Sequence, residues 1–108
     1  MITVEIRKSG EEYQGFSCKG HAGYGEAGKD IICAAVSALT VNTINSIEKF
    51  TKDAFKAEAA DGMVRWKFTK LPLSSETKLL MDSLVLGLEN IQETYGKKHI
   101  KIVEKSLT

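Results

Sequence analysis

The chain has 108 residues, of which 43% are hydrophobic and 27% are charged, and its formal net charge is +1. This length and composition predict one globular domain, residues 1–108, with a single core. A charge so close to zero argues against direct nucleic-acid binding, which usually needs a clustered basic surplus, although local docking on a ribonucleoprotein stays open.

The first residues do not resemble a targeting segment. Residues 1–13 alternate apolar and polar side chains and then turn acidic, without the basic start or apolar run of a signal peptide. The longest mostly apolar run, residues 31–41, is too short to cross a bilayer. We therefore expect a cytoplasmic protein with no membrane partner.

Two strands joined by a turn are expected first. Residues 1–8 alternate, which places Ile2, Val4 and Ile6 on one face. Residues 9–12 form the turn, and residues 13–20 form the returning strand, with Phe16 and Cys18 on its inner face. A glycine-rich loop follows over residues 21–29.

A helix is predicted from Asp30 to about Phe50. The Asp30 carboxylate can accept free N–H groups of the first turn and would be the N-cap. From Ile31 to Leu39 the helix is apolar or small on nearly every side, so more than one side should be covered. The cover is either a second subunit, which predicts a homodimer, or the second helix and the glycine loop.

The second half repeats the pattern of two strands and a helix. Residues 54–60 and 63–69 form a hairpin, because Asp61-Gly62 between alternating runs is a strong turn signal. A helix capped by Ser74 or Ser75 runs to about Tyr95, and residues 98–104 form a last strand. The order ββαββαβ predicts an α+β two-layer sandwich, with two helices and a five-stranded, mostly antiparallel or mixed sheet.

The glycine-rich loop matches two phosphate-binding patterns. Residues 23–28 read GxGxxG, and residues 23–29 read GxxxxGK. Asp30 stands where a P-loop has Ser or Thr, and Glu26 adds a second negative charge beside the phosphates. Because the parallel strand–helix–strand context is also missing, nucleotide binding is disfavoured, and no cofactor is expected. A purely structural role for the glycines, in a tight crossing from sheet to helix, remains open.

A cysteine nucleophile with a histidine base gives each part of this stretch a role. Cys33 lies in the predicted first helical turn, where free N–H groups and the helix dipole favour a thiolate and can receive an oxyanion. His21 ends the neighbouring strand and can accept the thiol proton. The loop between them, with Tyr24 as its large side chain, can close over an extended substrate. The glycines of this substrate-covering loop are Gly20, Gly23, Gly25 and Gly28.

The other candidate residues favour structural roles. Cys18 lies mid-strand and is expected to be a buried, inert thiol. His99, among lysines, is expected at the surface, and Trp66 in the core. Two cysteines without a CxxC pair, plus two histidines, do not form a zinc site, and a structural disulfide is not expected in a reducing cytoplasm.

Residues 20–39 resemble the ribosomal-processing cysteine protease Prp family. The resemblance rests on Gly20-His21-Ala22, on the spaced glycines, and on the run from Gly28 through Asp30, Cys33 and Ser37 to Leu39. Length and element order agree along the rest of the chain.

This resemblance implies an activity and its residues. Family members are cytoplasmic bacterial homodimers that remove a short N-terminal extension from protein twenty-seven of the large ribosomal subunit, after an aromatic pair and before a small residue. By position, Cys33 is the nucleophile and His21 the general base and later acid. Asp30 would cap the helix and orient His21, and Ser37 would hydrogen-bond or pack in the site. The alternative is a non-catalytic, ribosome-associated dimeric binding module.

Overall fold

A computed structural model describes residues 1–20 and 29–106 of the chain, and the side chains of residues 29 and 30 are not part of that description. Five strands and two helices follow one another in the predicted order. They are β1 (Ile2–Ser9), β2 (Glu12–Lys19), α1 (Lys29–Phe50), β3 (Phe55–Ala60), β4 (Met63–Phe68), α2 (Ser75–Tyr95) and β5 (Ile100–Ser106).

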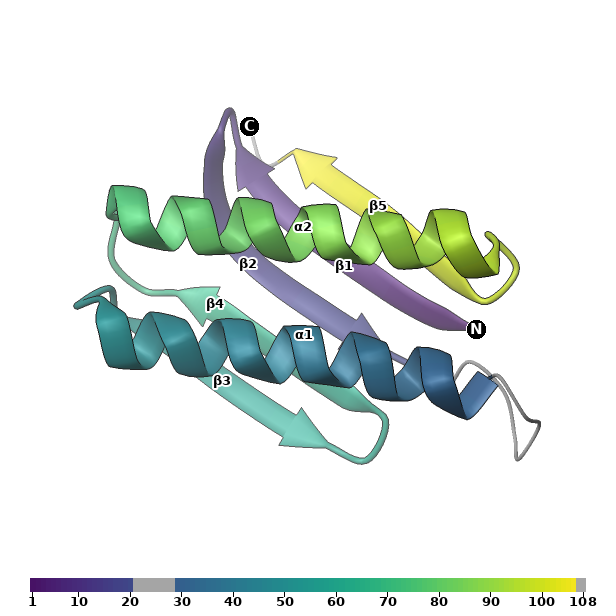
Figure 1. Cartoon of the computed structure of the whole chain (residues 1–108). Coiled ribbons are helices and arrows are strands. Elements are labelled where there is room, and N and C mark those ends of the chain that lie inside the picture. Colours follow the sequence, from purple (N-terminus) through teal and green to yellow (C-terminus); the bar gives the residue numbers. More distant parts are fainter. Residues whose placement is uncertain (21–28, 107–108) are drawn as a thin grey trace.

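The strands form one mixed sheet, and both helices lie against the same face of it (Figure 1). The strand order is β3-β4-β2-β1-β5, in which β1 and β5 are parallel and the other neighbours are antiparallel. The parallel pair arises because α2 carries the chain from β4 back across the sheet to its other edge. The α+β two-layer sandwich predicted from the sequence is confirmed.

The core lies between the sheet and the helices. In β1, Ile2, Val4 and Ile6 point toward the helices, as their alternation predicts. Phe16 of β2 stacks on Trp66 of β4 with ring centroids 4.5 Å apart. The buried hydrophobic residues are Ile2, Val4, Ile6, Tyr13, Phe16, Ile32, Val36, Ile47, Trp66, Phe68, Met81, Leu84, Leu88 and Ile100. Trp66 is thus a core residue, as expected.

Ser74 caps α2, and a buried polar network holds that cap in place. The Ser74 hydroxyl accepts from the Thr77 backbone N–H and itself donates to the Asp53 carboxylate at 2.6 Å. The Thr77 hydroxyl donates to the same carboxylate. These hydrogen bonds lower the pKa of Asp53 although burial opposes the shift, so the carboxylate stays charged and ties the start of α2 to the segment after α1.

The predicted starts of α1 and of the last strand are wrong. The helix α1 begins at Lys29, so Asp30 is its second residue and not its N-cap. The last strand begins at Ile100 because residues 97–99 turn, with the His99 N–H donating to the Gly96 carbonyl at 3.3 Å. His99 itself is half-buried at this turn, less exposed than the sequence predicts.

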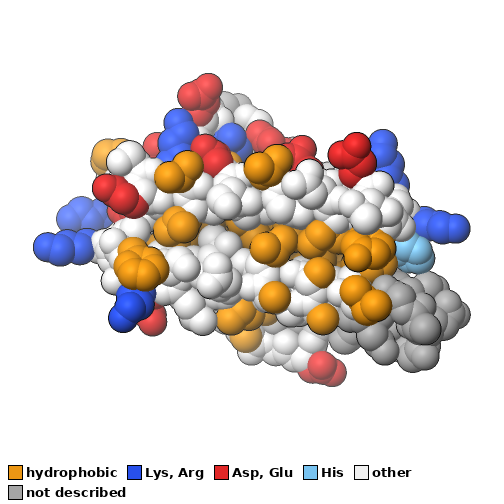
Figure 2. All heavy atoms as spheres, in the orientation of Figure 1, with side chains coloured by type: hydrophobic (Ala, Val, Ile, Leu, Met, Phe, Trp, Pro, Cys, Tyr) orange, Lys and Arg blue, Asp and Glu red, His pale blue; other side chains and the backbone are white. Residues whose placement is uncertain are grey.

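The outer side of α1 is apolar along its first half. Ile31, Ala34, Ala38 and Val41 recur at helical spacing and are all exposed. Figure 2 shows hydrophobic side chains gathered over the helical layer. By length and composition alone, α1 over Ile31–Phe50 could cross a membrane, with a mean hydropathy of 1.4. The shorter apolar run of residues 31–41 did not predict this, because the apolar residues continue beyond Val41 between polar ones. The core helix of a soluble protein passes the same test, but only 28% of this window is buried inside the chain.

Candidate active site

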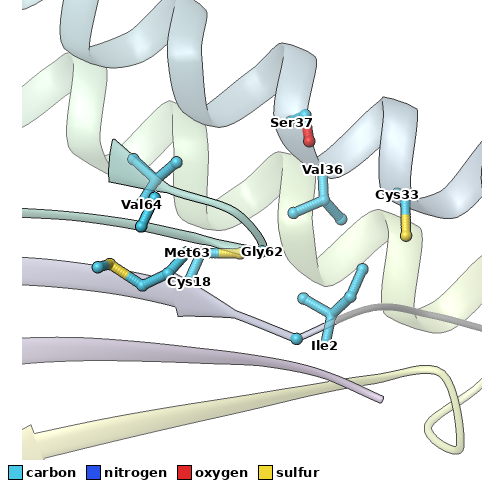
Figure 3. A pocket seen from close by; sticks show the side chains of 10 residues that line it. Ile2, Cys18, Cys33, Val36, Ser37, Gly62, Met63 and Val64 are labelled. Carbon is cyan, nitrogen blue, oxygen red and sulfur yellow. The ribbon is translucent and has the colours of Figure 1, made fainter. Parts of the chain in front are cut away.

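A cavity of about 220 Å³ lies between the first half of α1 and the adjoining end of the sheet (Figure 3). Its walls come from α1, from the end of β2, from the start of β1 and from the β3–β4 hairpin. The lining residues are Ile2, Cys18, Gly20, Cys33, Val36, Ser37, Ala60, Gly62, Met63 and Val64. The cavity is therefore mostly apolar, with two thiols and one hydroxyl.

Cys33 and Ser37 enter this cavity from α1. They are one helical turn apart and therefore share a face, as the sequence spacing predicts. Cys33 is half-buried, and its sulfur points from α1 toward the sheet in Figure 3. The side chain thus reaches both solvent and the cavity, which suits a nucleophile.

The earlier start of α1 changes how Cys33 relates to the helix end. Cys33 is the fifth helical residue and not part of the first turn, so its own N–H is used within the helix. The free N–H groups belong to the residues before it. Side chains lean toward the helix N-terminus, so the sulfur still lies over that first turn.

His21 and most of the predicted substrate-covering loop lie outside the described residues. This holds for Gly23, Tyr24, Gly25 and Gly28, and also for the Asp30 side chain. A role for Asp30 in orienting His21 therefore stays a prediction.

Gly20 is the last described residue before His21, and it is fixed to the cavity wall. Its N–H donates to the Gly62 carbonyl at 2.8 Å. Its φ of +101° and the 2.3 Å separation between a Cβ built there and the Met1 carbonyl oxygen leave room only for glycine. Gly20 thus lies directly after β2 and is held at the cavity wall, and its part in covering a substrate stays a prediction.

Cys18 faces the same cavity but is a poor nucleophile. Burial raises the pKa of its thiol to about 11, and the neighbouring Cys33 adds to the shift. At neutral pH only about one molecule in ten thousand then carries a Cys18 thiolate. The expectation of an unreactive thiol is thus supported, although its position beside Cys33 was not foreseen.

This contrast predicts selective alkylation. At pH 7 we expect iodoacetamide to modify Cys33 at least about a hundredfold faster than Cys18, because the thiolate is the reacting form. Labelling of Cys18 should rise about tenfold per pH unit until the pH nears 11. Peptide mass spectrometry over a time course measures both rates, and equal, slow labelling would contradict an activated Cys33.

Sequence reasoning missed the residues that the sheet brings to the cavity. Val64 reaches it because β4 pairs with β2, so that Val64 lies opposite Cys18 and both side chains face the helices. Met63 lies opposite Lys19 and lines the cavity where the β3–β4 hairpin turns. Ile2 reaches it from β1 on the other side of β2. The alternating sequence pattern predicted that all of these residues lie in strands. It could not predict which strands lie side by side in the sheet.

The described part of the chain, residues 1–20 and 29–106, holds no group of three or more His, Cys, Asp or Glu side chains that could bind a metal ion. The polar side chains that line the cavity are the thiols of Cys18 and Cys33 and the hydroxyl of Ser37.

Comparisons with known proteins agree on one family. The family model for cysteine protease Prp matches residues 1–101. The ribosomal processing cysteine protease Prp of Staphylococcus aureus is 28% identical over 99 residues, covering 90% of this chain and 93% of that protein. Its counterpart from Bacillus subtilis is 25% identical over 101 residues, covering 88% and 90%.

Solved structures give the same result. A crystal structure of the essential ribosomal processing protease Prp from S. aureus, in complex with a covalently linked product peptide, has a TM-score of 0.86 and 29% identity. The match covers 97% of this chain and 100% of the crystallised S. aureus chain. A second crystal structure of that protease holds a substrate peptide and also has a TM-score of 0.86. The chain therefore belongs to the cysteine protease Prp family.

Proposed function

We propose that this cysteine protease is a cytoplasmic endopeptidase that removes the N-terminal extension from protein twenty-seven of the large ribosomal subunit. The observation that carries the proposal is Cys33, half-buried on α1 with its sulfur at a cavity between helix and sheet. The chain's family includes a ribosomal processing protease crystallised with substrate and product peptides, which supports a ribosomal protein as substrate.

In the proposed mechanism the Cys33 sulfur attacks the scissile carbonyl carbon, and His21 accepts the thiol proton. The carbonyl oxygen then carries the negative charge, which the free N–H groups at the start of α1 can stabilise. Collapse of this intermediate breaks the C–N bond, and His21 returns the proton to the leaving amine. Water, activated by His21, hydrolyses the resulting thioester and regenerates Cys33.

The cavity supports a preference for apolar side chains next to the cut. Ile2, Val36 and Val64 lie around the space beside Cys33. A volume of about 220 Å³ accommodates one aromatic side chain. This agrees with cleavage after an aromatic pair, where the residue nearest the bond would fill the cavity. Ser37 would lie at its polar edge, within reach of the peptide backbone.

Cleavage of the natural substrate tests this proposal. The purified protein is incubated with the precursor of ribosomal protein twenty-seven from the same genome, and mass spectrometry locates the cut. We expect one cut, after two aromatic residues and before a small one. A precursor gene that begins directly at the mature sequence, or an uncut precursor, would overturn the substrate assignment.

We also propose that the protein works as a homodimer through the outer side of α1. The exposed stripe Ile31, Ala34, Ala38 and Val41 is apolar, and its alanines allow a second helix to approach closely. Burying such a stripe against a second copy would remove the largest apolar part of α1 from water.

Charge placed on this stripe should separate the subunits. We expect the wild type to elute at twice the chain mass in size-exclusion chromatography with light scattering, and Val41→Arg to elute as a monomer, because an unpaired charge cannot be buried. Leu71→Arg is the matched control, since Leu71 is also exposed, at 39%, but lies outside both helices. A monomeric wild type would contradict the homodimer.

A further inference from the structure

The outer face of the sheet, opposite the helices, is strongly basic. The strand register and the burial pattern place the side chains that point away from the core on this face. Its basic residues are Arg7 of β1, Lys19 of β2, Lys56 of β3, Arg65 and Lys67 of β4, and Lys101 and Lys105 of β5. We call this surface the basic sheet face; its only acidic residues within the described strands are Glu5 and Glu58.

Ion pairs neutralise only part of this charge. Glu5 pairs with Arg7 at 2.7 Å and with Lys105 at 3.5 Å, and Glu58 pairs with Arg65. On the basic sheet face, four lysines have no ion pair to any described residue, and all four are exposed: Lys19, Lys56, Lys67 and Lys101. The basic sheet face thus carries a larger positive charge than the +1 of the whole chain.

Acidic residues elsewhere balance the total. The helix α2 carries Glu76, Asp82, Glu89 and Glu93 against a single lysine, Lys78. The near-neutral composition therefore hides a separation of charge between the two layers. The expectation of no nucleic-acid binding depended on that total and did not take account of the register.

The middle of the basic sheet face is hollowed. Gly15 of β2 is buried there, and a Cβ at this position would lie 2.9 Å from the Trp66 carbonyl oxygen, so no side chain fits. A shallow pocket of about 230 Å³ lies on this face, and its lining includes Arg7 and Lys67, the register partners of Gly15. The residues that line it are Arg7, Phe16, Ser17, Lys56, Glu58, Arg65, Trp66 and Lys67. This pocket offers space for a phosphate group among several cations.

We propose that the basic sheet face binds the phosphodiester backbone of structured RNA. Its cations extend across all five strands, about 19 Å at the usual strand spacing, which suits a polyanion and not a single small anion. Phe16 and Trp66 point into the core, so the described strands offer no aromatic platform for stacking bases. The basic sheet face would therefore contact the phosphates of the RNA and would not recognise its base sequence.

The choice of RNA among polyanions rests on the proposed function, because a protease that processes a ribosomal protein meets ribosomal RNA at its substrate. The fold permits both activities together. The cavity with Cys33 lies on the helical side of the sheet, and the basic sheet face is on the opposite side. RNA binding would thus hold the enzyme on a ribosomal particle and leave the cavity open.

Removal of three unpaired lysines tests the proposal. Binding of a fluorescein-labelled RNA duplex of about 20 base pairs is followed by anisotropy as salt is varied. The triple variant Lys56→Gln/Lys67→Gln/Lys101→Gln should bind about a hundredfold more weakly than the wild type near 0.1 M salt. The slope of log affinity against log salt should fall by about two to three, as expected for three lost phosphate contacts.

The matched control removes the same charge from other surfaces. Lys49→Gln/Lys78→Gln/Lys98→Gln changes three exposed lysines that do not lie on the basic sheet face. It should bind RNA about as tightly as the wild type. Both triple variants should melt within a few degrees of the wild type, which excludes misfolding as the cause.

Three results would overturn the proposal: a wild type that does not bind the duplex, an equal loss in both triple variants, or equal competition by a poly-glutamate peptide or by anionic vesicles. The last result would indicate an acidic protein or a membrane surface instead. The binding assay is repeated with Cys33→Ala, which should bind RNA like the wild type. RNA binding and peptide cleavage are measured separately, so either proposal can fail without the other.

Discussion

Cys33→Ala should reduce peptide cleavage by at least about a thousandfold, because no other nucleophile on the described chain can replace it. Ser37 lies on the same face of α1, but a neutral hydroxyl is a far weaker nucleophile than a thiolate. The measurement is the rate of cleavage of a peptide with two aromatic residues before a small one, followed by chromatography.

Cys18→Ala is the matched control for this variant. Cys18 lines the same cavity and is also a half-buried thiol, but its pKa is raised to about 11. Its removal should leave cleavage within a few-fold of the wild type and cost the stability expected for a small core truncation, about 1 kcal/mol. Retained cleavage in Cys33→Ala would assign the nucleophile elsewhere.

Cys33→Ala also distinguishes the protease hypothesis from the hypothesis of a non-catalytic binding module. A binding module would tolerate the substitution without loss of function in the cell. A protease would keep its affinity for the precursor and lose turnover, so the variant should form a stable complex with uncut substrate. Capture of the precursor by Cys33→Ala, without its cleavage, is the expected result.

The sequence predicted local structure well because each element has a local cause. Alternation identified the strands, the Asp61-Gly62 turn identified the hairpin, and Ser74 or Ser75 was predicted to cap α2, of which the structure selects Ser74. The errors lie where tertiary contacts set a boundary. The strand β5 begins at Ile100 because the Ile2 N–H donates to the His99 carbonyl, which fixes where pairing with β1 starts.

The candidate site was predictable in part. Cys33 and Ser37 could be placed on one face of a helix from their spacing alone. The apolar wall of the cavity could not be predicted from the sequence. It depends on the pairing of β4 with β2, two strands that are far apart in the chain. The basic sheet face was hidden for the same reason: its cations come from five strands, and only the register shows that they share a surface.

His21→Ala should lower the rate of peptide cleavage by about a hundred- to ten-thousandfold, the usual contribution of a general base. Its matched control is His99→Ala, because His99 is the other histidine and serves the fold through its backbone carbonyl, which the substitution keeps.

If His21 transfers protons, added imidazole should restore part of the cleavage rate in His21→Ala and none in Cys33→Ala. Iodoacetamide should also modify Cys33 more slowly in His21→Ala, because the thiol has lost its proton acceptor. A loss of cleavage without rescue and without slower labelling would instead assign His21 a structural role.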